Sequence, residues 1–157
     1  MQMWFGRSMK HDEPKLVGRT FDAGSPFIVT AEKIASFCEA VGDYNPLYLD
    51  REAAKAGPYG EIVAPPAFVA SFHYADNVFD QLPRYGRGGL MGGIDFELEA
   101  PIRVGDSIRV TSEVKEIYEK TGRTGTMIFV VIRSTLVNQK GEVVARVDHR
   151  MMNRAKS

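Results

Sequence analysis

The segment VGDYNPLYLD, Val41 to Asp50, concentrates side chains that can do chemistry. Asp43 can accept a proton as a general base, and Tyr48 can donate a hydrogen bond, although a phenol that titrates near about 10 exchanges protons poorly at neutral pH. Both residues also have simpler interpretations, because an aspartate beside a glycine commonly caps a turn and a tyrosine commonly packs against a core. Asn45 followed by Pro46 favours the start of a turn. The residue types alone leave a site and a connection both open.

Other reactive side chains are few and scattered. Cys38 is the only cysteine, so an intrachain disulfide is impossible, and its place in an apolar helical stripe indicates a core residue. The histidines His11, His73 and His149 show no metal-ligand spacing, so we predict no metal site. We interpret His73 as a satisfied helix residue and His149 as a packed strand residue.

Composition excludes several function classes. The 157 residues suffice for one domain with a single core. The 20 basic residues balance the 20 acidic ones, so no net field attracts nucleic acid or an anionic membrane. The N-terminus lacks the continuous apolar stretch of a signal peptide, and the longest apolar run, Met127–Ile132, is too short to span a bilayer. We therefore expect a soluble, cytoplasmic protein.

Two short helices are expected on either side of Asp43. Thr30 is a good N-cap, and an apolar stripe at helical spacing ends where Gly42 can terminate the helix. Asp50 can cap a second helix that ends at Gly57. Between them, the VGDYNPLYLD segment becomes a helix-to-helix connection.

The rest of the chain predicts one buried helix followed by strands. Pro65 and Pro66 suit the opening of a helix, and the apolar residues from there to Leu82 surround the helix on most sides. The glycine-rich stretch from Tyr85 to Gly93 is expected to be a loop. Four alternating or apolar segments follow, and the one over 126–137 is apolar on both faces for half its length, so it should be central in its sheet.

These elements predict an α+β domain in which an antiparallel sheet wraps around a long central helix. We place the domain over residues 25–157, after an irregular leader over residues 1–24. The edge strands of such a sheet invite pairing with a second copy.

Three segments resemble the MaoC-like hydratase/dehydratase family: GDYNPLYLDREAA, YGEIVAPPAF and PIRVGD. The resemblance covers Thr20 to Asn153. It implies a single hot-dog domain that assembles as a homodimer or a higher homo-oligomer. It also implies reversible addition of water to a trans-2-enoyl thioester to give the R-3-hydroxyacyl product. Coenzyme A or acyl carrier protein is then part of the substrate, and no separate cofactor is implied.

The family motif G-D-x-N-P-[LIV]-H carries over by position, and one residue departs from it. Asp43 matches the catalytic acid, and Asn45 and Pro46 match the segment that shapes the site. The histidine of the motif falls on Tyr48, which titrates far from neutrality and so is a poor replacement as a proton exchanger.

A second departure lies at the start of the expected central helix. A family glycine whose N–H polarises the thioester carbonyl falls on Pro66, which has no N–H. The N–H of Ala67 is the next candidate donor at this helix start. Phe68 follows as a core residue that can also line an acyl tunnel.

Three functions remain open at this stage. The first is a hydratase or dehydratase in which Asp43 acts as base toward water and Tyr48 orients water or substrate. The second is a non-catalytic acyl-binding subunit that pairs, as a hetero-oligomer, with a catalytic hot-dog partner supplying aspartate and histidine. The third is acyl-thioester hydrolysis on the same fold.

Overall fold

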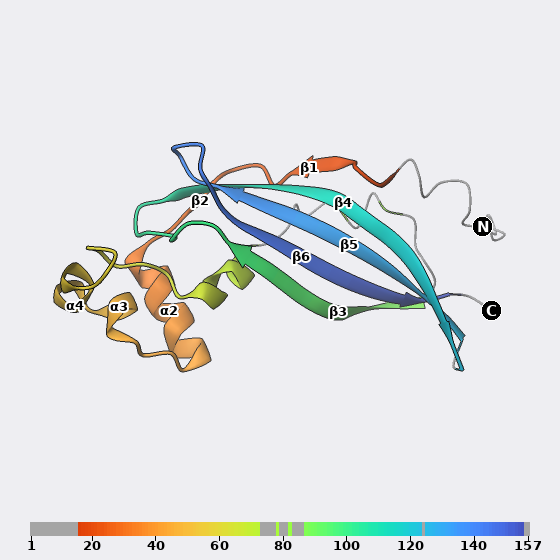
Figure 1. The fold of residues 1–157 in the computed structure, drawn as a ribbon, viewed down its shortest axis with the longest axis horizontal. Coiled ribbons are helices and arrows are strands. Elements are labelled where there is room, and N and C mark those ends of the chain that lie inside the picture. Colours follow the sequence, from red (N-terminus) through yellow and green to blue (C-terminus); the bar gives the residue numbers. More distant parts are fainter. Residues whose placement is uncertain (1–15, 73–77, 79–81, 83–86, 124, 156–157) are drawn as a thin grey trace, which may run out of the picture.

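The computed structural model describes residues 16–72, 78, 82, 87–123 and 125–155. Its centre is an antiparallel sheet in the order β1-β4-β5-β6-β3, with β2 also paired to β4. The strands are β1 (Thr20–Asp22), β2 (Phe27–Ile28), β3 (Arg87–Leu98), β4 (Ser107–Gly122), β5 (Gly125–Val137) and β6 (Val143–Arg154). The four long strands run side by side and the helices gather at one end of the sheet (Figure 1). The α+β class predicted from the sequence is confirmed.

β5 is the central strand, as its two-sided apolar pattern predicted. It pairs with β4 on one side and β6 on the other, so both of its edges are protected. Its even-numbered side chains from Ile128 to Leu136 are all buried, and Val131 on the opposite face is buried as well. Strands covered on both faces carry such continuous apolar runs.

The first helices begin and end where the sequence predicted. In α2 (Ala31–Val41), the Thr30 side chain accepts a hydrogen bond from the Lys33 N–H at 3.3 Å. The helix ends at Gly42, whose φ of 72° lies in the left-handed region that glycine adopts without strain. α4 (Arg51–Ala56) begins after Asp50, which accepts from two backbone N–H groups of the first turn.

An aromatic cluster attaches the helical end to the sheet. Phe68 is only 1% exposed, and its ring packs edge-to-face against Phe27, Phe37 and Phe72 at centroid distances of 6.4, 5.4 and 5.6 Å. Such ring pairs add stability beyond the area they bury. The same core cluster includes Ile34 and Cys38 of α2 together with residues of β4, β5 and β6.

A second core cluster lies further along the strands. It combines Leu16 and Phe21 with residues of β4 and β5 and with Val78 and Leu82. On β4, buried Ser112 comes between the two clusters and shares a hydrogen bond of 3.0 Å with buried Ser134 of β5. This hydroxyl pair satisfies its own polar groups inside an otherwise apolar core.

The leader assignment needs correction at its C-terminal end. The sequence placed residues 20–22 in an irregular segment, but they form β1 and pair with β4 at residues 111–113. Residues 1–15 lie outside the described part of the chain. A three-residue strand is too short to show alternation, so only its pairing with a long neighbour reveals it.

The long central helix is also corrected. The double proline does open a helix, but this is the 3-10 helix η2 (Pro66–Ser71). Phe72 ends it with an extended backbone, at φ −85° and ψ 114°. That turn places the Phe72 ring 4.8 Å from the ring of Phe27. Residues 73–77 and 79–81, and with them the interpretation of His73, lie outside the described residues. The longest described helix is α2, with 11 residues.

The glycine-rich stretch is strand, not loop, from Arg87 onward. β3 pairs with β6 from Arg87 to Leu98, with register shifts on either side of the pair Leu90–Met91. A Cβ on Gly92 would lie 3.2 Å from the Arg150 carbonyl oxygen, so the two backbones approach closely there. Glycine therefore lowers strand propensity while permitting this contact, and the cross-strand pairing decides the outcome.

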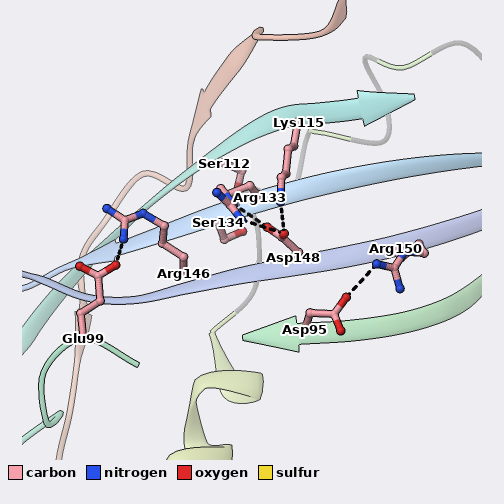
Figure 2. Close-up of polar contacts among 9 residues, drawn as sticks. All are labelled: Asp95, Glu99, Ser112, Lys115, Arg133, Ser134, Arg146, Asp148 and Arg150. Atoms are coloured by element: carbon pink, nitrogen blue, oxygen red, sulfur yellow. Dashed lines mark hydrogen bonds and ion pairs between the residues drawn. The ribbon is translucent and has the colours of Figure 1, made fainter. Parts of the chain in front are cut away.

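The outer face of the sheet carries a charge network centred on Asp148 (Figure 2). The carboxylate accepts hydrogen bonds from the Arg133 Nε and Nη2 atoms at 2.7 and 2.9 Å and from Lys115 Nζ at 2.5 Å. Burial raises the pKa of Asp148, but the hydrogen bonds and charges of these two cations outweigh it, and the net pKa is lowered. Among the described residues, no helix is both long and apolar enough to cross a membrane.

Replacing Asp148 by Asn tests this network. The side chain is 12% exposed, so the substitution leaves two cations without their shared charged acceptor. We expect a loss of about 1–3 kcal/mol in the free energy of unfolding near pH 7. Because folding lowers the pKa of Asp148, the stabilisation exists above the unfolded value of about 3.9 and is lost as pH falls through the folded pKa. Urea unfolding near pH 7 and near pH 3 measures the free energy of unfolding of the wild type and of Asp148→Asn. A difference between the two proteins that is the same at both pH values would contradict the assignment.

Replacing Phe68 by Ala tests the aromatic cluster. The expected loss is about 3–5 kcal/mol in the free energy of unfolding, because a large buried ring is removed from contact with three others. Tyr44→Ala is the control, since Tyr44 is 66% exposed and its truncation should change stability by no more than about 0.5 kcal/mol. Similar losses in the two variants would show that the cluster is not what attaches the helical end.

Candidate functional site

The acid and the amide of the first motif are engaged in local turns. The Asp43 N–H donates to the Cys38 carbonyl at 2.9 Å, which continues the end of α2. An Asp43 carboxylate oxygen accepts from the Asn45 N–H at 3.3 Å. Asn45 in turn accepts from the Leu47 N–H at 3.0 Å and caps α3 (Pro46–Leu49). These contacts match the turn-capping interpretation of both residues.

Tyr48 lies in α3 and packs against the main core cluster. Its pKa is raised, first by burial and then by the negative charges of Asp43, Cys38 and Tyr59. At neutral pH the phenol therefore keeps its proton and acts as a hydrogen-bond donor.

A cavity of about 400 Å³ lies beside Tyr48 and the double proline. Its walls come from α3, from the segment over 58–66, from η2 and from the end of β3 with the turn that follows. The lining residues are Leu47, Tyr48, Pro58, Tyr59, Val63, Ala64, Pro65, Pro66, Val69, Leu98, Glu99, Ala100, Pro101 and Ile102. Most are apolar, and the only ionisable side chains among them are Tyr48, Tyr59 and Glu99.

The two walls that meet at this cavity are joined by backbone contacts across some 40 residues of sequence. Val63 and Arg103 form an isolated antiparallel bridge. The Ala64 N–H donates to the Ile102 carbonyl at 2.8 Å. This pairing sets the double proline against the turn after β3. Sequence patterns show neither partner of such a single bridge, so Val63, Ala64 and Ile102 were not predicted as site residues.

Glu99 is the one carboxylate in the cavity wall, and it forms an ion pair with Arg146 of β6 (Figure 2). The pair fixes the carboxylate toward the outer face of the sheet and compensates its charge. Glu99 is thus a poor general base toward anything held in the cavity.

The structure divides the residues expected at the site into two groups. Tyr48 and Pro66 line the cavity. The lining does not include Asp43, Asn45, Pro46, Ala67 or Phe68. Ala67 is exposed at the start of η2, whereas Phe68 is buried in the aromatic cluster. Among the described residues, the wall therefore combines an apolar surface with two tyrosines and the ion-paired Glu99, and no histidine lines it.

The arrangement suits binding of an apolar group more than proton transfer. Its volume falls in the range of small-molecule sites, and such sites combine apolar walls with a few polar groups that fix orientation. Within the described residues, no group of three or more histidine, cysteine, aspartate or glutamate side chains is placed to hold a metal ion. His11 and His73 fall outside the described residues, and buried His149 is not in the cavity wall.

Comparisons with known proteins identify relatives over most of the chain. A family model, FAS1-like, dehydratase domain region, matches residues 15–147. A UPF0336 protein of Streptomyces coelicolor is 36% identical over 148 residues, which cover 91% of this chain and 95% of that protein. A probable enoyl-CoA hydratase alpha subunit of Thermomonospora curvata is 30% identical over an alignment of 169 positions, which includes 97% of this chain and 50% of that protein.

Two solved structures share the arrangement of elements. A chain of the HadBC (3R-hydroxyacyl-ACP dehydratase) complex from Mycobacterium tuberculosis has a TM-score of 0.73 and 26% identity, with coverage of 88% of this chain and 97% of that chain. A MaoC-like dehydratase from Rhodospirillum rubrum has a TM-score of 0.67 and 26% identity, with coverage of 90% and 94%. The sheet, the double-proline cavity and these matches agree: this chain belongs to the family of FAS1-like dehydratase regions and has the hot-dog fold of MaoC-like dehydratases and hydratases.

Proposed function

We propose that this chain holds the acyl group of a thioester substrate in a MaoC-like dehydratase or hydratase, while a second hot-dog chain supplies the catalytic aspartate and histidine. The reaction is the reversible addition of water to a trans-2-enoyl thioester. Coenzyme A or acyl carrier protein is part of the substrate. One observation carries the proposal: among the described residues, the apolar cavity at the double proline has Tyr48, and no histidine, in its wall.

The cavity favours the hydrocarbon part of such a substrate. Each methylene transferred from water to an apolar wall contributes about 0.8 kcal/mol. Val63, Val69 and Ile102 provide such a wall, and the phenols of Tyr48 and Tyr59 provide hydrogen-bond donors at its polar positions. The residues of this wall thus suffice to bind an acyl tail.

Hydration requires more than the cavity offers. A proton must move between water and the α-carbon of the substrate, which suits a group that titrates near neutrality. The raised pKa of Tyr48 keeps its proton in place. Pro66 lines the cavity but has no N–H to polarise the thioester carbonyl. Loss of a general acid/base lowers a rate roughly 100- to 10,000-fold, so a second chain that restores this group is the simplest remedy.

Two relatives support a divided site. The relative from Thermomonospora curvata is described as an alpha subunit, and the HadBC structure is a complex. We extend both descriptions to this chain as part of the proposal. The competing functions are a self-sufficient hydratase that uses Asp43 and Tyr48, and an acyl-thioester hydrolase.

Turnover of crotonyl-CoA separates these functions. We expect the purified chain alone to show no loss of enoyl absorbance above the protein-free rate. The complex of this chain with a histidine-bearing MaoC-like chain of the same genome should hydrate crotonyl-CoA. Within that complex, Tyr48→Phe should change kcat by no more than about threefold, whereas alanine at the partner's histidine should lower it roughly 100- to 10,000-fold.

The opposite pattern would refute the proposal. Turnover by the chain alone, lost with Tyr48→Phe or Asp43→Asn, would establish the self-sufficient hydratase. Release of free thiol without prior loss of the double bond would establish the hydrolase.

Binding of butyryl-CoA, which has no double bond to hydrate, tests the cavity itself. Pro66→Trp places a large side chain in the wall and fills the space for the tail. It should therefore raise the dissociation constant measured by calorimetry by about tenfold or more. Pro26→Trp is the matched control, since Pro26 is exposed and does not line the cavity. Equal affinity of both variants, with unchanged melting temperatures, would place the acyl group elsewhere.

A further inference from the structure

Gly57 lies at a position where the backbone itself does not require glycine. It follows α4 with φ −83° and ψ 179°, an extended conformation that any residue adopts. Its N–H donates to the Ala54 carbonyl at 3.1 Å, and its carbonyl accepts from the Gly60 N–H at 3.3 Å. Pro58 comes next, and the residue before a proline is restricted to the extended region. The backbone at Gly57 is therefore well held, and its conformation suits a residue with a side chain.

The space beside Gly57 is occupied by Leu47 of α3. A Cβ built on Gly57 would lie 2.6 Å from the Leu47 Cδ2 atom. Two carbon atoms attract best at roughly 3.5–4.0 Å, so these two groups could not both keep their places. The same Cβ would lie 3.3 Å from the carbonyl oxygens of Ala53 and Ala54, contacts that small adjustments relieve. The missing side chain of Gly57 is thus what allows Leu47 to lie against the end of α4.

Leu47 also forms part of the cavity wall. It lines the cavity beside Tyr48, and Pro58, which follows Gly57 directly, lies in the same wall. The Leu47 side chain is half-buried. Because Leu47 both contacts Gly57 and lines the cavity, its position sets how much of the cavity is open to a ligand.

We propose that Gly57 determines the length of the acyl group that the cavity accepts, because it leaves Leu47 room to lie back against α4. The inference rests on the proposed function, which places an acyl tail in this cavity, and it names the residue pair that limits the tail. Gly57 acts through Leu47 and is a positioning residue, while Leu47 is the group that meets the tail.

A methyl group at residue 57 would drive Leu47 into the cavity. The backbone yields little, because the fixed φ of Pro58 and the hydrogen bonds with Ala54 and Gly60 hold it. A leucine side chain changes between staggered rotamers, so it moves by a whole rotamer step. The apolar cavity keeps the displaced methyl groups from water, whereas a turn toward solvent exposes them. The end of a long tail then loses its place, while a short tail still fits.

The dependence of affinity on chain length tests this inference, with calorimetry on the full-length chain and with butyryl-CoA, hexanoyl-CoA and octanoyl-CoA. In the wild type, each added methylene that the wall covers should lower the dissociation constant about fourfold. Gly57→Ala should keep the dissociation constant of butyryl-CoA within about twofold and raise that of octanoyl-CoA about four- to fifteenfold, because one or two methylenes lose their place.

Gly122→Ala is the matched control. Gly122 ends β4 with a φ outside the left-handed region, and a Cβ there would have no atom of the described residues within 4 Å. Its dependence on chain length should equal that of the wild type. Melting temperatures of the wild type and both variants show whether Gly57→Ala stays folded, since a loss of folding would weaken binding of all three ligands alike.

Leu47→Ala removes the side chain that limits the tail. It should favour octanoyl-CoA over butyryl-CoA at least as strongly as the wild type does. The double variant Leu47→Ala/Gly57→Ala should match Leu47→Ala, because the added methyl group has no Leu47 side chain to displace. This comparison also decides the matter if Gly57→Ala alone does not fold. A double variant that still discriminates against octanoyl-CoA relative to Leu47→Ala would overturn the proposal.

Failure of this inference can be told from failure of the proposed function. Butyryl-CoA binding that is lost in Pro66→Trp, together with the same dependence on chain length in Gly57→Ala and the wild type, would refute the role of Gly57 alone. A wild-type chain that binds none of the three acyl-CoAs would refute the acyl-binding function, and the role of Gly57 with it.

Discussion

The cavity is positioned by the packing of Phe68 against three other rings, because the helix that carries Phe68 also contributes to the cavity wall. The edge-to-face contacts to Phe27, Phe37 and Phe72 connect the segment before α2, α2 itself and both ends of the short 3-10 helix. Pro65 and Pro66 are separated from Phe68 by Ala67 alone, and their fixed φ angles limit the freedom of the backbone between the rings and the cavity wall. The main core cluster and the cavity wall also share Val69 and Ile102, so the apolar character of the wall depends partly on core residues.

The described wall of the cavity is mostly apolar, and the residues of the first motif stabilise the loop beside it. Tyr48 packs against the core and lines the cavity, and where the family motif has a histidine it supplies a phenol, which keeps its proton at neutral pH. Asp43 and Asn45 retain structural work as turn caps even without catalysis. These two residues thus have a structural role in the loop that does not depend on catalysis.

Much of the fold could be predicted from the sequence, because the features that set it are local. Thr30, Gly42 and Asp50 act as caps where their types predicted, and the two-sided apolar pattern identified β5 as central. The errors came from non-local pairing: β1 is short, and glycine-rich β3 is held in place by β6. The cavity was only half predictable, since the bridge between Val63 and Arg103 joins segments that no local pattern connects.

The strand β3 has poor intrinsic propensity, and its two faces differ in character. Pairing with β6 places it in the sheet, so its side chains need not stabilise the monomer and are available for another role. An unprotected edge with apolar residues ordinarily risks aggregation, and charged residues on such edges oppose nonspecific pairing. Asp95 and Glu97 of β3 are placed to serve that function, and Asp95 also forms an ion pair with Arg150 of β6. The alternation of Ile94, Phe96 and Leu98 with Asp95 and Glu97 thus gives one edge strand an apolar face and a charged face.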